Sequence, residues 1–183
     1  MKTKITLLVG ALIVSGLLVA QTTPEPAAKV MEAAYKQAAK EKKNVMVVFH
    51  ASWCGWCKKF DASVNDSTCK DFFNKSFVII HLTILENADK KQLENPGAID
   101  IYNNNGGTGG GIPYFLIYDK TGKLLADSKM KPAGAGPDVK ASNMGCPASE
   151  EEVAAFVEVL KKTSKITDKE ATAITARFKK NKS

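Results

Sequence analysis

The segment Ala51-Ser52-Trp53-Cys54-Gly55-Trp56-Cys57-Lys58 contains two cysteines three positions apart. Side chains at that spacing share one face of a helix, so the two sulfurs can form a disulfide with little strain. The apolar, β-branched run at residues 45–49 precedes the segment and predicts a strand buried on both faces. A strand that ends there places Cys54 at the N-terminus of the next helix and Cys57 one turn further in.

This placement predicts different properties for the two thiols. Unpaired backbone N–H groups and the helix dipole favour the thiolate of Cys54, whereas Cys57 is more shielded. A thiol with a pKa of about 8.5 is roughly 3% thiolate at pH 7, and one with a pKa of about 7 is half ionised. The pair therefore predicts a redox-active disulfide in which one sulfur attacks and the other resolves, without a bound cofactor. A buried structural disulfide and half of a zinc site are the alternatives.

Patterning outside this segment predicts one α/β domain with parallel units first and an antiparallel hairpin second. Turn residues 119–122, with Gly122 supplying a positive φ, join the two strands of that hairpin. Ser149 with Glu152, and Thr167 with Glu170, are capping boxes that start the last two helices. Helices are predicted at 27–42, from 53, at 66–74, at 149–162 and from 167; strands at 45–49, 77–84, 114–118 and 123–126; a polar stretch at 86–92, a flexible loop at 103–111 and an insertion at 129–148.

The order of these elements, the Trp-Cys-Gly-Trp-Cys-Lys motif and the distant Gly111-Ile112-Pro113 together resemble the thioredoxin superfamily over residues 27–162. Within it the chain is most similar to exported thioredoxin-like proteins related to the C-terminal domain of the bacterial electron-transfer protein DsbD. The resemblance implies a central mixed sheet of four to five strands flanked by helices. It also implies that Cys54 attacks, that Cys57 resolves and that Pro113 is a cis-proline beside them. A trans proline at the start of an edge strand is the alternative.

The resemblance also implies a surface for substrate proteins. By that resemblance the backbone of Ile112 pairs with the substrate. Separately, the residues Trp53 and Trp56, with Gly55 between them, are candidates for an apolar substrate-binding rim around the thiol. A cis X-Pro bond presents an open backbone edge near the disulfide, where an extended peptide can form hydrogen bonds.

The chain departs from the family pattern at Val48, where thioredoxins carry a buried Asp that helps to deprotonate the resolving thiol. His81, in the neighbouring strand, and His50, four residues before Cys54, are candidate substitutes because imidazole titrates near neutral pH. A histidine that only packs or faces solvent is the alternative for each.

The motif also bears on the direction of electron flow. Trp56 precedes the resolving cysteine and offers no cation or hydrogen bond to stabilise the thiolate, which favours a more reducing pair. The Ile112-Pro113 dipeptide resembles that of reducing thioredoxins. We therefore expect a reductase or a general thiol:disulfide exchanger, supplied with electrons by a DsbD-type membrane donor. A disulfide oxidase or isomerase of the same fold, a metal-binding module using Cys54 and Cys57 with His50 or Cys146, and a binding or chaperone module are the alternatives.

Two more cysteines, Cys69 and Cys146, need an explanation. In the resembled fold the active-site helix and the C-terminal helix cover the same sheet face, so a structural disulfide between them is feasible. The two cysteines are 77 positions apart, and a disulfide that closes a loop of this length would stabilise the fold by about 4.5 kcal/mol in the chain-entropy model. Two free thiols and auxiliary redox groups that exchange with Cys57 are the alternatives.

The N-terminus predicts export. Residues 1–20 combine Lys2 and Lys4 with an apolar stretch, as in a signal peptide, with an uncleaved anchor as the alternative. Residues 21–26 form a linker, 27–163 the domain, and 164–183 a C-terminal helix with a basic tail. Removal of the leader leaves 24 basic and 19 acidic residues, a modest net charge of +5. No basic aromatic face or motif indicates nucleic-acid binding. We expect a periplasmic or secreted monomer.

Overall fold

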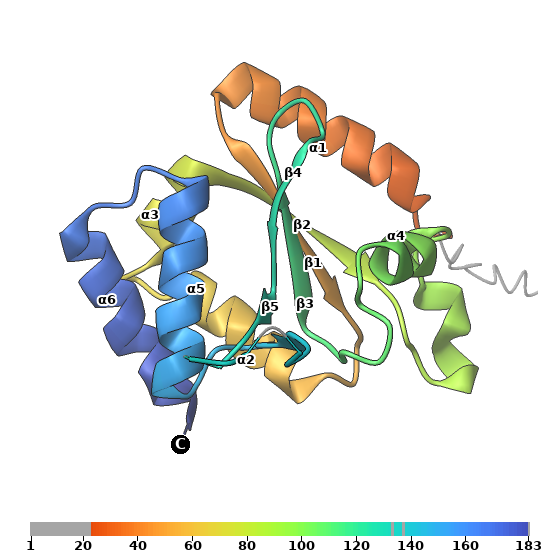
Figure 1. Ribbon diagram of the computed structural model, residues 1–183. Helices are drawn as coiled ribbons and strands as arrows, with labels where there is room; N and C mark the ends of the chain where they lie inside the picture. Colours follow the sequence, from red (N-terminus) through yellow and green to blue (C-terminus); the bar gives the residue numbers. More distant parts are fainter. Residues whose placement is uncertain (1–22, 133, 137, 183) are drawn as a thin grey trace, which may run out of the picture.

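The computed structural model describes residues 23–132, 134–136 and 138–182, and at its centre lies a mixed four-stranded sheet (Figure 1). The strand order is β2-β1-β3-β4, with β1 parallel to β2 and antiparallel to β3. The strands are β1 (Asn44–His50), β2 (Phe77–Thr83), β3 (Tyr114–Tyr118) and β4 (Leu124–Asp127). The expected mixed sheet is confirmed with four strands.

Strand β1 is buried because its side chains are apolar on both faces of the sheet. Met46 and Val48 point into one core, and Val45, Val47 and Phe49 point into the other. This alternation is the period-2 geometry of a strand. His50 ends β1 on the same side as Val48, because the two residues are two positions apart.

The first face of the sheet is covered by four helices (Figure 1). They are α2 (Gly55–Val64), α3 (Lys70–Ser76), α5 (Glu150–Thr163) and α6 (Asp168–Lys179). Stacked and edge-to-face aromatic rings join these helices to β3. The core rings are Phe60, Phe73, Phe115, Phe156 and Phe178. The C-terminal helix thus shares its core with the active-site helix.

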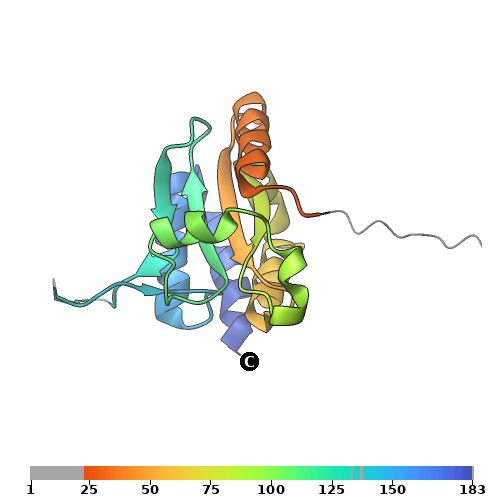
Figure 2. The same cartoon turned by 90° about the vertical axis from the view of Figure 1, so that its right-hand side faces the viewer.

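The second face carries α1 (Ala27–Glu41) and α4 (Ala98–Asn104), and Figure 2 shows both in front of the sheet. Helix α1 buries Met31 and Ala34, whereas α4 buries Tyr102. The Tyr102 ring meets the ring of Tyr114 edge to face, at a centroid distance of 5.3 Å. Helix α4 thereby places the glycine-rich residues that follow it beside the start of β3.

Three predicted segments differ from the structure. The polar stretch contains the 3₁₀ helix η1 (Ala88–Leu93), and α4 takes the first two residues of the predicted loop. Both segments are short and carry several polar residues, and α4 buries Ala98 and Tyr102 through tertiary contacts that helix propensity does not show. The second helix begins at Lys70 rather than 66, because the Asp66 carboxylate accepts hydrogen bonds from Thr68 in a turn.

Other predicted local signals are confirmed. Both capping boxes are present, and Gly122 has a φ of +88° in the β3–β4 turn. The insertion contains a small second sheet of β5 (Lys129–Met130) and β6 (Ser142–Asn143). After α6 the 3₁₀ helix η2 (Lys180–Lys182) completes the described chain.

The predicted leader at residues 1–20 lies outside the described residues, as do the first two residues of the linker. Among the residues that the structure describes, none of the helices has the length and apolar character needed to span a membrane.

Candidate active site

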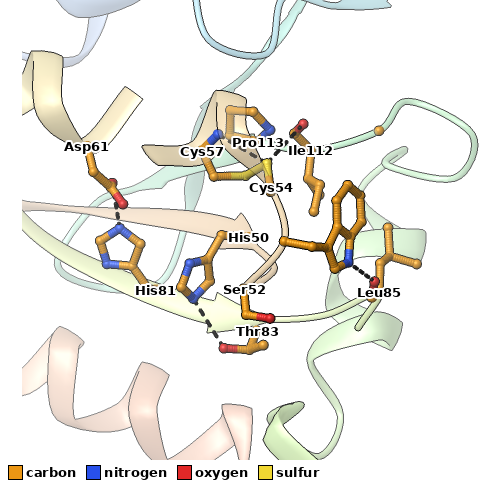
Figure 3. The surroundings of a disulfide bond; sticks show 12 residues. His50, Ser52, Cys54, Cys57, Asp61, His81, Thr83, Leu85, Ile112 and Pro113 are labelled. Carbon is orange, nitrogen blue, oxygen red and sulfur yellow. Dashed lines mark hydrogen bonds and ion pairs between the residues drawn. A yellow bond between two sulfur atoms is a disulfide. The ribbon is translucent and has the colours of Figure 1, made fainter. Parts of the chain in front are cut away.

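The two cysteines of the motif lie between the end of β1 and the first turn of α2. Figure 3 shows the two sulfur atoms and the residues around them. Cys54 is the N-cap residue of α2, and its sulfur accepts a hydrogen bond from the backbone N–H of Cys57 at 3.0 Å. The two residues form a disulfide with an S–S distance of 2.07 Å and a Cα–Cα distance of 5.3 Å. The helix therefore directs its N-terminal N–H groups at the sulfur of Cys54.

The segment before β3 covers this disulfide. The Ile112–Pro113 peptide bond is cis, which is the isomer that the family resemblance implies. The Ile112 carbonyl oxygen lies 3.7 Å from the Cys54 sulfur, and Ile112 packs against the cluster that Ala51, Cys54 and Cys57 form. Cys54 and Cys57 are accordingly buried.

The surface around the disulfide is apolar and exposed. Trp53 is 51% exposed and Trp56 is 49% exposed. The Trp53 indole N–H donates to the carbonyl of Leu85 at 2.8 Å, and the Lys59 ammonium lies 4.6 Å from the centroid of the Trp56 ring. A side chain added at Gly55 would meet no atom within 4 Å, so the space beside the first residue of α2 is open. These residues form a rim on which an apolar substrate segment can lie.

A buried carboxyl group that the sequence analysis missed forms hydrogen bonds with the start of the motif. Glu86 is 4% exposed and lies just beyond the end of β2. Its two oxygens accept hydrogen bonds from the backbone N–H of Ser52 at 2.5 Å and from the Ser52 hydroxyl at 2.8 Å. Its own N–H donates to Glu94 at 2.8 Å. Glu86 therefore holds the loop that carries Cys54.

The two candidate bases lie side by side under α2. His81 pairs in register with Val48, and its Nε2 lies 2.8 Å from an Asp61 oxygen on α2. His50 Nε2 lies 3.1 Å from the Thr83 hydroxyl, and the two imidazole rings are 5.0 Å apart. In the described part of the chain, neither ring is hydrogen-bonded to a cysteine sulfur. Figure 3 shows both histidines beneath the disulfide.

Burial lowers the pKa of His50 from its usual 6.5, and the neighbouring His81 acts in the same direction. The carboxylates of Asp61 and Glu86 oppose this change. The lowered pKa favours the neutral form of His50 at neutral pH, which is the form that a proton acceptor needs.

The disulfide considered between Cys69 and Cys146 is not formed, and both residues are buried free thiols. The sulfur of Cys69 lies 3.5 Å from the hydroxyl of its neighbour Thr68. The sulfur of Cys146 accepts a hydrogen bond from the Asn181 amide at 3.4 Å. Burial raises the pKa of Cys69, and raises that of Cys146 to about 12. Both are free thiols with little tendency to ionise.

Asn181 is a second residue that the sequence analysis missed. It is 4% exposed in η2, and its amide bonds to the Ser63 hydroxyl and to the carbonyl of Pro147 as well as to Cys146. The Lys59 ammonium donates to its backbone carbonyl at 3.2 Å. Hydrogen bonds thus join the end of the described chain to α2 and to the insertion.

Three of the residues expected around the disulfide also line a groove. The groove has a volume of about 240 Å³. Trp56, Ile112 and Pro113 line it together with Asn143 and Cys146 from the insertion. Among the described residues there is no cluster of three or more His, Cys, Asp or Glu side chains arranged to hold a metal ion.

Comparison with solved structures gives weak global similarity. The chain is similar to a disulphide isomerase from Xylella fastidiosa Temecula1, with 16% identity, a TM-score of 0.47, and coverage of 86% of this chain and 92% of that one. It is also similar to a DsbH oxidoreductase, with 19% identity, a TM-score of 0.44, and coverage of 79% and 85% respectively.

The family comparison covers the site itself. Residues 27–120 match the model of a family described as thioredoxin-like, and this range contains Cys54, Cys57 and Pro113. The match extends over more than half of the chain and includes the whole of β1, α2, β2 and β3. The chain therefore belongs to the thioredoxin-like family.

Proposed function

We propose that the protein is an exported thiol:disulfide oxidoreductase that reduces or exchanges disulfides of secreted or periplasmic proteins. The observation that carries the proposal is the position of Cys54, whose sulfur caps α2 and accepts the Cys57 N–H at 3.0 Å. The same N–H groups stabilise negative charge on the Cys54 sulfur once the disulfide is reduced. Cys54 is then the attacking thiolate, and Cys57, one turn inside the helix, is the resolving thiol.

The reaction has two exchange steps. The Cys54 thiolate attacks a sulfur of the substrate disulfide, which forms a mixed disulfide and releases one substrate thiolate. Cys57 then loses its proton and attacks the Cys54 sulfur, which forms the Cys54–Cys57 disulfide and releases the second substrate thiolate. Two electrons pass to the substrate, and its two thiolates take up protons. His50 or His81 is the proposed route for the Cys57 proton, since both lie under α2.

The proposed direction is reduction. The side chain of Trp56 offers the sulfurs no cation, so the reduced pair is not stabilised as it is in strong oxidants. A reductase outside the cytoplasm needs a source of electrons, and we propose a DsbD-type membrane donor. Residues 1–20 supply the proposed export signal. Cell fractionation of the full chain tests the location.

The reaction is tested by trapping. Cys57→Ser leaves the attacking thiol but removes the resolving one, so it is expected to accumulate mixed disulfides with substrate proteins that dithiothreitol cleaves. Cys54→Ser is expected to trap nothing. Equal trapping by the two variants, or none by either, would refute the assigned roles.

The direction is tested separately by a reduction potential measured against glutathione in the variant with Cys69 and Cys146 changed to Ser. A value near −270 mV, about that of thioredoxin, supports a reductase, and one near −120 mV, about that of DsbA, would reverse the direction.

A further inference from the structure

The insertion between β4 and α5 reaches back to the active site through one side chain, Asn143. Its amide nitrogen lies 3.0 Å from the carbonyl oxygen of Gly110, 3.2 Å from that of Gly111 and 2.9 Å from that of Pro113. The two N–H groups of one amide thus serve three carbonyl groups on both sides of Ile112. No other single side chain in the described part of the chain contacts that segment so extensively by hydrogen bonds.

The acceptor half of the same amide is anchored to the sheet. Asn143 Oδ1 accepts hydrogen bonds from the Ser128 hydroxyl at 2.7 Å and from the Gly145 N–H at 3.0 Å. Ser128 is fully buried, and its hydroxyl in turn accepts the N–H of Phe115 on β3 at 3.2 Å. A continuous chain of hydrogen bonds therefore runs from β3 through Ser128 and Asn143 to the residues that flank Ile112.

The position of Ile112 matters because its carbonyl lies 3.7 Å from the Cys54 sulfur. On the opposite side, the hydroxyl of Tyr102 donates to the Gly111 carbonyl at 3.2 Å. The glycine-rich segment is therefore held between α4 and the insertion. Glycines at 109 and 111 have positive φ and carry no side chain to restrict the backbone, so these hydrogen bonds supply much of the restraint.

We propose that Asn143 is a positioning residue that fixes the Ile112–Pro113 segment beside Cys54 and thereby controls docking of protein substrates in the groove between Trp56 and the insertion. This inference rests on the proposed function. A backbone that is already held in place loses less conformational entropy when an extended segment binds along it, so binding is tighter. A small disulfide reaches Cys54 without using the groove, so it should not depend on Asn143.

Two variants at Asn143 and one control variant test the role of the amide. Asn143→Ala removes donor and acceptor. Asn143→Asp keeps the acceptor for Ser128 and Gly145 but turns a charged oxygen toward the three carbonyl groups at neutral pH. Ser142→Ala is the matched control, because Ser142 is exposed on the same short strand.

The readouts are kcat and KM for reduction of insulin with dithiothreitol as the reductant that regenerates the dithiol, and the rate of reaction of the reduced protein with the small disulfide 5,5′-dithiobis(2-nitrobenzoate). For Asn143→Ala we expect KM for insulin to rise about tenfold, while the small-disulfide rate changes by less than about twofold. Ser142→Ala should match the wild type in both. A KM within about twofold of the wild type, or a parallel fall in both rates, would overturn the inference.

The aspartate variant adds a pH profile that a general loss of folding would not produce. As the pH falls, the carboxyl group becomes neutral and its O–H can donate to one of the three carbonyl groups. The insulin KM of Asn143→Asp, divided by that of the wild type at each pH, should therefore fall toward one. A constant ratio would contradict a donor role for Asn143.

A wild-type protein that reacts with the small disulfide but not with insulin would refute the proposed function, not the positioning role. In that case hydrogen exchange of the backbone amides at residues 110–115 decides. Faster exchange in Asn143→Ala than in Ser142→Ala supports the positioning role, and equal exchange refutes it.

Discussion

Replacement of Glu86 by Ala is expected to destabilise the fold by about 3 kcal/mol and to loosen the active-site loop. The substitution deprives the Ser52 N–H and hydroxyl of their acceptors, at 2.5 Å and 2.8 Å, in a site where Glu86 is only 4% exposed. Each hydrogen bond to a charged group contributes about 1.5–3 kcal/mol, whereas the Ser52 donors lie on an exposed residue and can bond to water once Glu86 is removed. Relief of the cost of burying a carboxylate offsets part of that sum.

Two companion variants test this reasoning. In Glu86→Gln the amide oxygen still accepts the Ser52 N–H, and the Ser52 hydroxyl can rotate to accept from the amide nitrogen, so the expected loss is under about 1 kcal/mol. Ser52→Ala removes only the hydroxyl bond, with an expected loss of about 1 kcal/mol.

The free energy of unfolding of the oxidised proteins in urea is the measurement, with the reaction rate of reduced Cys54 as a second readout. That rate should fall in Glu86→Ala and persist in Glu86→Gln, because Cys54 follows Ser52 by two residues. A loss below about 0.5 kcal/mol for Glu86→Ala, or equal losses for the Ala and Gln variants, would refute the argument.

Three further outcomes are expected. Because burial lowers the pKa of His50, the unfolded chain binds a proton there before the folded protein does, so stability falls as the pH drops below about 6.5. His50→Gln should flatten that decline in urea unfolding at several pH values, and an unchanged slope would contradict it. Phe156→Ala should cost about 3–5 kcal/mol in the same assay, because Phe156 is fully buried among four other rings, and a loss below about 1 kcal/mol would be inconsistent with that packing. Alkylation of the protein unfolded without reductant should add two groups by mass, on Cys69 and Cys146, whereas no addition would indicate a disulfide between them.

Local sequence signals are sufficient to predict the main helices and strands of the fold. The apolar run of β1, the capping boxes of α5 and α6 and the glycine turn between β3 and β4 each depend on residues within a few positions of one another. The cysteine pair belongs to the same class, since its placement at the start of α2 follows from a strand and a helix that are adjacent in sequence.

The supporting residues of the site could not be found in that way. Glu86 lies 34 positions from Ser52, and Asn143 lies 30 from Pro113. Each is one polar residue in a segment without periodicity, and only the folded chain selects its partner. Helix α4 was missed for a related reason, because its burial depends on Tyr102 packing against β3 rather than on helix propensity.

The hydrogen bond from Asn181 to Cys146 has a practical consequence for handling the protein. The Asn181 amide covers the sulfur of Cys146, which also lines the groove beside Trp56. Limited digestion that trims the chain after Phe178 would therefore uncover a third thiol next to the substrate surface, and thiol counts on aged preparations would drift upward. An affinity tag at the C-terminal end adds bulk close to this contact, whereas a tag placed ahead of α1 is separated from it by the whole domain.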